Sequence, residues 1–360
     1  MARRNRYYGL ILAGGRGTRF WPRSRRRRAK QVLEFFGEQS LIQQTAARLT
    51  PLIAPERIWV ITNHYLAAEI ARQLPQVPRR QILAEPVGRN TAPAVGLVAQ
   101  ILQRADPGAV MGVFPSDHLV AHPARYRQLL RPAFRAAEMG KIAVLGIKPQ
   151  WAETGYGYIE FAEGVVPGAL HSVPVLRFRE KPDAATAERF IASGRFFWNA
   201  GMFFWRASVY LEALRRHLPK TASLLASLPP LASRRFGARL KETFPLCENI
   251  SVDYAVMEKA RGVVGVAAGD IGWNDVGTWN AVYELEARGA GANVTRGEAL
   301  FHFASGNFVD APGKLVALLG VDNLVVVDTP DALLVADRRR SQQVSDIVKT
   351  LEKQKRGKLL

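Results

Sequence analysis

The stretch Leu10-Ile-Leu-Ala-Gly-Gly-Arg-Gly-Thr-Arg19 decides how the rest of the chain is interpreted. An apolar run, Tyr7–Ala13, predicts a buried strand that leads into glycines and then into cations. Gly14, Gly15 and Gly17 let the backbone bend sharply, so that its N–H groups can approach phosphate oxygens. The stretch therefore predicts a phosphate-binding loop at the end of a first core strand.

The cations that follow the glycines fit the same interpretation. Arg16 and Arg19 can neutralise the charge of a triphosphate, and a guanidinium group can do so through two hydrogen bonds. Lys30 is expected to follow as a mobile point charge. A glycine turn without a ligand would leave these three cations unexplained.

Two other classes of glycine loop fit less well. A P-loop ends in Gly-Lys-Ser/Thr, whereas this loop ends in Gly17-Thr18-Arg19, which excludes that class. The dinucleotide fingerprint of oxidoreductases needs a third glycine where this chain has Phe20. An NAD-dependent oxidoreductase is therefore a disfavoured alternative.

Strands alternate with helices in the first part of the chain. The predicted strands are Tyr7–Ala13, Arg57–Thr62, Gln81–Ala84, Ala109–Phe114 and Ile142–Ile147, and the predicted helices are Ser40–Leu49, Tyr65–Leu74, Asn90–Arg104 and Tyr126–Glu138. This alternation predicts βαβ units and a mostly parallel sheet of the α/β class. Because ligands bind at the carboxyl ends of such strands, the loops after the first and fourth strands are the candidate site.

The middle and the end of the chain have different patterns. The middle has few helices between its first strands. The predicted strands there are Tyr156–Phe161, Val173–Arg179 and Met202–Trp205, and the predicted helices are Ala185–Ser193, Ser208–His217 and Val252–Arg261. After Glu286 come short β runs at Ala299–Phe303, Leu315–Leu319, Leu324–Asp328 and Ala332–Ala336, and then a helix, Ser341–Lys353. We therefore predict a large α/β domain over residues 1–288 and a small β-rich domain, which ends in a helix, over residues 289–360. The second domain should pack on the first or on a second subunit, and in the latter case we expect a homodimer.

The net charge of +19 predicts polyanionic partners. Part of this charge is the arginine cluster Arg25–Arg28, for which a solvated surface is the plainer interpretation. A nucleic-acid-binding protein is the alternative of a different class. However, the cluster has no interleaved aromatic residues and the chain has no known binding motif, so we expect phosphorylated metabolites and no nucleic acid.

The cysteine content and the hydropathy of the chain indicate in which cell compartment the protein works. The single cysteine, Cys247, excludes an internal disulfide framework and a cysteine metal cluster. The basic segment Met1–Arg6 and the apolar run Tyr7–Ala13 are together similar to a signal sequence. However, the apolar run is short and is followed by glycines and arginines, so we interpret it as a core strand. No run approaches the ~20 apolar residues of a membrane span. We expect a cytoplasmic protein that does not bind a membrane.

The sequence resembles the sugar-phosphate nucleotidylyltransferase family. The resemblance begins with Gly-Gly-x-Gly-Thr-Arg-x-Trp-Pro-x-Ser-Arg and Lys30-Gln31, and the Phe20-Trp21-Pro22 variant is similar to the branch that acts on mannose 1-phosphate with GTP. It continues in order through Glu85–Pro93, Phe114–His118, Gly155–Gly157, Glu180–Pro182, Trp198–Gly201, Ser251–Tyr254 and Gly272–Trp279. One departure is Ala29, which stands where the family usually has proline and frees the backbone before Lys30.

The resemblance implies a Rossmann-like nucleotide-diphospho-sugar transferase domain followed by a short β-helix-like domain. It implies that GTP and mannose 1-phosphate react to give GDP-mannose and pyrophosphate, with Mg²⁺ as the cofactor. A different sugar substrate, such as a heptose 1-phosphate, is the alternative. We expect no fused isomerase module. The implied catalytic residues are Arg16, Arg19, Lys30 and Lys181, and the implied metal ligands are Asp117 and Asp275. The implied nucleotide contacts are Leu12, Ala13, Gly14, Gly15, Gly17, Thr18, Glu85, Arg89, Asn90 and Thr91, and the implied sugar-phosphate contacts are Gly155, Gly157, Glu180, Lys181, Asn199, Gly201 and Asp253.

Several of these residues have simpler interpretations. Asp117 can cap the following segment, Asp275 can form an Asx-turn, and Lys181 can be an exposed loop residue. Asp253 can be an acid in the first turn of a helix. For His118 a structural role is preferred over a general base, because a phosphate monoester is already ionised.

Overall fold

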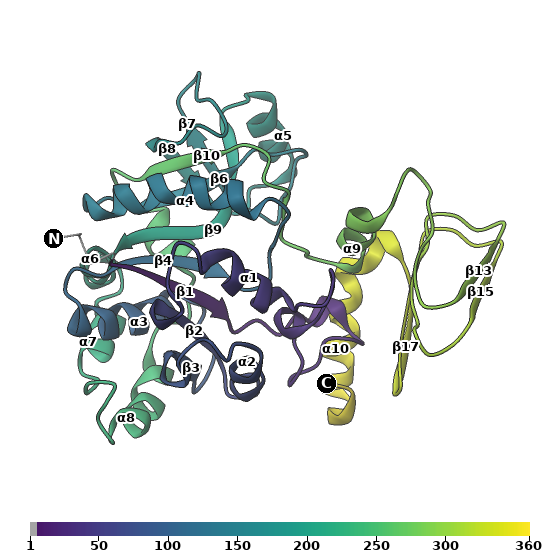
Figure 1. Cartoon of the computed structure of the whole chain (residues 1–360), viewed down its shortest axis with the longest axis horizontal. Coiled ribbons are helices and arrows are strands. Elements are labelled where there is room, and N and C mark those ends of the chain that lie inside the picture. Colours follow the sequence, from purple (N-terminus) through teal and green to yellow (C-terminus); the bar gives the residue numbers. More distant parts are fainter. Residues whose placement is uncertain (1–5) are drawn as a thin grey trace.

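The computed structural model describes residues 6–360. Most of the preceding basic segment, which raised the signal-sequence alternative, lies outside the described residues. The described chain forms a large α/β part and a small β part, which lies beside it at the right of Figure 1. Within the described residues, no helix is both long enough and apolar enough to cross a membrane.

The large part is built on a nine-stranded sheet in the order β3-β2-β1-β4-β9-β6-β10-β8-β7. The strands are β1 (Tyr7–Ala13), β2 (Ile58–Asn63), β3 (Ile82–Glu85), β4 (Val110–Pro115), β6 (Ala143–Ile147), β7 (Tyr158–Phe161), β8 (Val173–Arg179), β9 (Phe196–Arg206) and β10 (Val264–Ala268). Only β8 and β9 run against the other seven strands, so the prediction of a mostly parallel sheet is confirmed.

Helices cover both faces of this sheet (Figure 1). One layer contains α1 (Leu41–Leu49), α2 (Ala67–Gln73), α4 (Pro123–Glu138) and α5 (Ala184–Ala192). The other contains α3 (Thr91–Ala105), α6 (Ala207–His217), α7 (Pro219–Ala226) and α8 (Phe236–Thr243). Leu10 packs into the second layer and Ile11 into the first, and both are buried. Burial on both faces explains why the central strands are continuous apolar runs.

The small part has the form of a short β-helix. One sheet contains β12 (Val294–Arg296), β14 (Phe308–Asp310), β16 (Leu324–Thr329) and β17 (Ala332–Asp337), and the other contains β13 (Ala299–His302) and β15 (Val316–Leu319). Strands of successive turns stack in parallel, and β17 folds back antiparallel on β16. The β-helix-like fold predicted from the resemblance is therefore confirmed.

A shared hydrophobic core joins the two parts. Phe20, Trp21 and Phe35 come from the segment after the glycine loop, and Trp279 comes from α9 (Trp279–Glu286). They pack with β14, β16 and β17 and with the terminal helix α10 (Val344–Lys353), which stands between the two parts in Figure 1. Of the two packing partners predicted for the small β part, the structure shows the large α/β part of the same chain.

Ion pairs reinforce this contact. Arg23 pairs with Asp310 in β14, and Arg25 pairs with Asp331 in the turn after β16 and lies over the ring of Trp21. The prediction that Arg25 belongs to a solvated surface is wrong, because its side chain is only 16% exposed. Residues 26–28 of the cluster are exposed as predicted.

Two predicted elements differ from the structure. The helix predicted over Val252–Arg261 is shorter in the structure and is not an α-helix. The segment makes only one π-helical turn, η6 (Asp253–Met257), because three consecutive residues, Ala255 to Met257, all enter the core before the chain turns toward β10. The strand predicted over Met202–Trp205 begins earlier, at Phe196, so the Trp198–Gly201 motif lies inside the sheet.

The remaining elements are short. Two-residue strands β5 (Leu119–Val120) and β11 (Trp273–Asn274) form a separate ladder. The 3-10 helices are η1 (Thr18–Phe20), η2 (Lys30–Val32), η3 (Pro55–Arg57), η4 (Arg79–Gln81), η5 (Phe244–Leu246), η7 (Arg338–Gln343) and η8 (Gly357–Leu359). The first two of these helices carry the signature residues of the predicted phosphate site.

Candidate active site

The glycine loop leaves β1 at the carboxyl edge of the parallel strands. The side-chain amide of Gln31 donates hydrogen bonds to the carbonyl oxygens of Ala13 at 2.7 Å and Gly15 at 3.0 Å. Gly17 has a φ of 61°, and a Cβ at this position would lie 2.6 Å from the Cβ of Lys30. Both the backbone conformation and the available space therefore require glycine at position 17.

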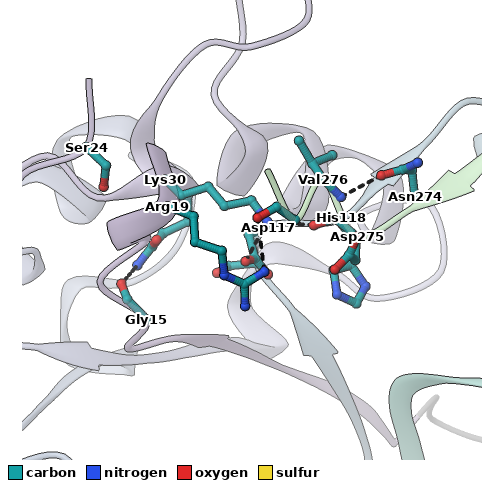
Figure 2. Close-up of polar contacts among 12 residues, drawn as sticks. Gly15, Arg19, Ser24, Lys30, Asp117, His118, Asn274, Asp275 and Val276 are labelled. Carbon is teal, nitrogen blue, oxygen red and sulfur yellow. Dashed lines mark hydrogen bonds and ion pairs between the residues drawn. The ribbon is translucent and has the colours of Figure 1, made fainter. Parts of the chain in front are cut away.

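Lys30 connects the loop to both predicted metal ligands (Figure 2). Its Nζ lies 2.9 Å from Oδ2 of Asp117 and donates a hydrogen bond of 2.6 Å to the main-chain oxygen of Asp275. Burial alone would raise the pKa of Asp117, but the charge and the hydrogen bond of Lys30, together with other contributions, bring the pKa below its usual value. The prediction of a mobile charge at Lys30 is wrong, since these contacts hold a side chain that is almost fully buried.

A short ladder brings Asp117 and Asp275 together. β5 follows Asp117 and pairs antiparallel with β11, which directly precedes Asp275. Asp117 follows β4 at the carboxyl edge of the main sheet, whereas Asp275 arrives through a ladder outside that sheet.

His118 is a half-buried, neutral residue next to this pair. The indole Nε1 of Trp273 donates a hydrogen bond of 3.2 Å to Nδ1 of His118. Burial lowers the pKa of His118 to about 4. The imidazole is therefore uncharged near neutral pH, and its Nδ1 already serves as an acceptor, which fits the structural role preferred from the sequence.

A cavity of about 420 Å³ opens beside the glycine loop. It is lined by Leu12, Gly14, Gly15, Ile61, Glu85, Gly88, Asn90, Thr91, Ala94, Pro115, Gly201, Phe203, Val252 and Asp253. Glu85 is buried, and its Oε1 has no hydrogen-bond partner among the described residues. Burial raises the pKa of this carboxyl to about 7. Arg89 does not line the cavity, because its guanidinium donates to the carbonyl oxygen of Pro245.

The predicted sugar-phosphate contacts form a second cluster. Nδ2 of Asn199 donates to Oδ1 of Asp253 at 2.9 Å, and Lys181 Nζ lies 3.5 Å from Oε1 of Glu180. A Cβ on Gly157 would lie 2.3 Å from Oε2 of Glu180, so the glycine makes room for this carboxyl. Burial, and then the charge of Asp253, raise the pKa of Glu180 to about 7.

A second cavity, of about 540 Å³, lies where the two parts of the chain meet. It is lined by Arg19, Trp151, Glu153, Gly155, Tyr156, Lys181, Asn274, Asp275, Gly277, Thr278, Asn280, Ala281, Glu284, Arg338, Arg339, Ser341 and Gln342. Arg19 also donates a hydrogen bond of 3.1 Å to the carbonyl oxygen of Gly277. Residues of η7 thus form one wall of a cavity that holds Arg19, Lys181 and Asp275.

Strained backbone gathers at the same place. Asn90 (φ 62°), Lys181 (φ 44°) and Val276 (φ 47°) adopt the left-handed region that residues other than glycine avoid. Such strain costs free energy and persists where the surrounding structure enforces it, often at functional sites. Val276 follows Asp275 directly, and its N–H donates to Asn274 Oδ1 at 2.7 Å.

The arrangement agrees with a comparison of the sequence with protein families. The family model described as Nucleotidyl transferase matches residues 8–290, which is most of the chain.

The chain belongs to the nucleotidyl transferase family.

Within this nucleotidyl transferase, a second family model, described as MannoseP isomerase/GMP-like beta-helix domain, matches residues 304–351. Two curated mannose-1-phosphate guanylyltransferases are similar to it over nearly its whole length. The one from Escherichia coli is 40% identical over 352 residues, covering 96% of this chain and 74% of that protein, and the one from Klebsiella pneumoniae is 39% identical over 353 residues, covering 97% and 74%. Nucleotidyl transferases of this family typically use a divalent metal ion.

A solved structure is also similar to this nucleotidyl transferase. It is named as mannose-1-phosphate geranyltransferase from Thermus thermophilus and is 37% identical. The two folds agree with a TM-score of 0.86 over 97% of this chain and 100% of that chain. The agreement covers both the nine-stranded part and the small β part.

The structure of this nucleotidyl transferase gathers most, but not all, of the predicted site residues around the loop. Arg16 points to the terminal helix, where it pairs with Glu352, and Arg89 points to Pro245. Sequence reasoning did not name Gln31 as a site residue, although it adjoins Lys30 in the signature and fixes the loop. It also did not name Val276, because no local pattern reveals a left-handed residue after Asp275.

Proposed function

We propose that this nucleotidyl transferase forms GDP-mannose and pyrophosphate from GTP and mannose 1-phosphate. The observation that carries the proposal is the convergence of the glycine loop with Lys30 and the pair Asp117 and Asp275. This convergence lies at the carboxyl edge of parallel strands, where ligands of α/β sheets bind. The likeness to curated mannose-1-phosphate guanylyltransferases supports the choice of substrates.

The donor set fits Mg²⁺. Within the described residues, no group of three or more His, Cys, Asp and Glu side chains gathers as a metal site. Mg²⁺ in phosphoryl-transfer sites needs only one or two carboxylates and completes its coordination with substrate phosphates and water. Asp117 and Asp275 would supply those carboxylates. Bound there, the ion would neutralise charge on the reacting phosphates.

The residues of the chain can bind and orient both substrates. An oxygen of mannose 1-phosphate attacks the α-phosphorus of GTP, a new P–O bond forms, and the bond to pyrophosphate breaks. Both reactants are anions, so the work is charge neutralisation and in-line positioning. We propose that Arg16, Arg19 and Lys30 serve the triphosphate and that Lys181 serves the sugar phosphate. The attacking phosphate is already ionised and needs no general base, which agrees with a neutral His118.

A panel of substrates tests this function. Four NTPs are combined with several sugar 1-phosphates, including mannose and heptose 1-phosphates, and pyrophosphate release is measured. GTP with mannose 1-phosphate should give the highest kcat/KM. A preference for UTP or dTTP would contradict the guanylyl assignment, and a preference for the heptose would favour the alternative sugar.

We propose that Glu85 recognises the guanine edge. It lies in the cavity of about 420 Å³ beside the glycine loop, with an unpartnered Oε1. Guanine presents neighbouring N1–H and N2–H donors, which a carboxylate can accept with its two oxygens. Asn90 and Thr91 line the same cavity at the start of α3.

The pH dependence of GTP binding tests this role of Glu85. Because the pKa of Glu85 is about 7 in the free protein and guanine requires the ionised form, the affinity for GTP should fall as the pH drops below 7. The fall should approach about tenfold per pH unit. Glu85→Gln places an NH₂ group against a guanine donor, so it should weaken GTP binding roughly 10- to 100-fold and flatten the profile.

Binding measured by calorimetry between pH 5.5 and 8.5 gives the profile. The titration of the nucleotide itself is common to both proteins and cancels in their comparison. A Glu85→Gln variant with an unchanged affinity and the same pH profile would contradict the assignment.

Three further proposals concern the whole chain. We propose a division into a catalytic domain, 1–288, and a β domain, 289–360. We propose a homodimer, for which exposed apolar residues on the β domain, including Leu300, Phe303 and Leu319, offer a surface. We also propose a cytoplasmic location, which is consistent with the single cysteine and with substrates that are cell metabolites.

A further inference from the structure

An ion pair links the phosphate loop to the terminal helix. Nη2 of Arg16 lies 2.5 Å from Oε1 of Glu352 in α10. The two residues are 336 positions apart in the sequence. The hydroxyl of Ser24 donates a hydrogen bond of 2.9 Å to the main-chain oxygen of Arg16. The backbone of Arg16 is therefore held in place, and only its side chain can change partners.

The helix that carries Glu352 is firmly anchored. Val344, Val348 and Leu351 of α10 are buried in the core that the two parts of the chain share, together with Phe20 just after the loop. In η8, which follows α10, the carbonyl oxygen of Leu359 accepts a hydrogen bond of 2.9 Å from the indole of Trp21. The carboxylate therefore has a fixed place beside the phosphate loop.

The pair itself is only partly buried. The side chains of Arg16 and Glu352 are 48% and 33% exposed. Ion pairs in such positions contribute little stability, so a ligand with several negative charges can replace the carboxylate at low cost. Arg26 lies 3.8 Å from the same oxygen of Glu352, which leaves the carboxylate a second cation nearby when Arg16 turns away.

We propose that Glu352 is a resident counter-anion for Arg16. The pyrophosphate portion of the nucleotide displaces the Glu352 carboxylate from Arg16 on binding, and the ion pair re-forms when pyrophosphate leaves. The proposal rests on the proposed function, in which Arg16 neutralises the triphosphate. Glu352 is a positioning residue, since it acts through Arg16 and forms no bond to a reacting atom.

The proposal distinguishes between ligands. A ligand that carries the outer phosphates must compete with Glu352 for Arg16 and also meets the negative charge of the carboxylate. A ligand that has only the α-phosphate does not need Arg16. Removing the charge of Glu352 should therefore strengthen the binding of pyrophosphate and GTP and leave the binding of GMP unchanged.

The experiment compares full-length Glu352→Gln with the wild type. Calorimetry with inorganic pyrophosphate, GTP and GMP, each with Mg²⁺, should show pyrophosphate and GTP binding about two- to fivefold tighter and GMP binding equally. Release of pyrophosphate, followed by stopped flow, should slow by a similar factor. Asp346→Asn is the matched control, because it removes the same charge from the same helix at a residue paired with Lys349.

Two results would overturn the proposal. One is that Glu352→Gln binds pyrophosphate as the wild type does, or more weakly, while its melting temperature is unchanged. The other is that Asp346→Asn tightens pyrophosphate binding equally, which would reduce the effect to overall charge. In an Arg16→Gln background the substitution of Glu352 should tighten pyrophosphate binding much less than in the wild type, because only the direct repulsion by the carboxylate remains. Failure of the proposed function would appear separately, as a wild-type protein that does not use GTP and mannose 1-phosphate.

Discussion

Asp117→Asn should lower kcat/KM by about 10²-fold or more, equivalent to about 3 kcal/mol of transition-state stabilisation. The substitution removes a carboxylate from the proposed Mg²⁺ site and also removes the ion-pair partner of Lys30. Both changes affect the charge balance around the reacting phosphates, so the loss should appear in kcat and not only in KM. The steady-state kinetics of GDP-mannose formation give both constants.

A double variant separates the two roles of Asp117. Asp117→Asn alone leaves the almost fully buried ammonium of Lys30 without its carboxylate, so the melting temperature should fall. Adding Lys30→Met should recover the melting temperature without recovering activity. Asp275→Asn should lose activity to a similar extent while the ion pair between Lys30 and Asp117 remains. EDTA should abolish activity and added Mg²⁺ should restore it.

An Asp117→Asn enzyme within threefold of the wild type at low Mg²⁺ would remove Asp117 from the metal site. The same result for Asp275→Asn would contradict the two-carboxylate arrangement. Asp346→Asn serves as the control here as well, because its carboxylate lies on α10 and pairs only with a neighbour on that helix in the described contacts.

Removal of residues 289–360 should destroy the native fold of the remaining chain. The deletion takes β14, β16, β17 and α10 out of the shared core and uncovers Phe20, Trp21 and Trp279. Loss of a single large core side chain costs about 2–5 kcal/mol, and the whole stability of a domain is only about 5–15 kcal/mol. We expect aggregation or a much lower melting temperature, measured by calorimetry or circular dichroism, and loss of GTP binding.

A substitution on the far face of the β domain is the control for this truncation. Phe303 is 81% exposed in the single chain and lies outside the shared core, so Phe303→Ser should leave the fold intact by circular dichroism. If the elution volume of Phe303→Ser changes, the proposed dimer surface is supported. A truncated chain that keeps full activity, melting temperature and elution volume would contradict the structural role of the shared core.

The predictions from sequence succeeded where a pattern is local. β1 has the predicted bounds because its apolar run ends at the pair Gly14-Gly15, where the phosphate loop begins. The N-terminus of α1 was predicted within one residue, since Ser40 and Gln43 form a capping box there. The glycine loop and Lys30 were identified because strand, turn and cations follow one another within about twenty positions.

The failures depend on contacts between distant segments. β10 was missed because Val264–Ala268 is short and contains Gly265, whose missing side chain makes room for the ring of Phe161. The ladder of β5 and β11 has only two residues in each strand and no periodicity to detect. The pairing of Arg16 with Glu352 joins residues 336 positions apart, and no local pattern in either segment reveals it.

The core that holds Phe20 and Trp21 against Val344 and Val348 has a consequence for synthesis on the ribosome. The phosphate loop is made among the first residues, but the helix that packs beneath it is made more than 300 residues later. Contacts between such distant segments form late in folding. A growing chain can complete much of its large sheet while its signature loop still lacks this support. The nascent enzyme should therefore acquire nucleotide affinity in one late step, after α10 has left the exit tunnel.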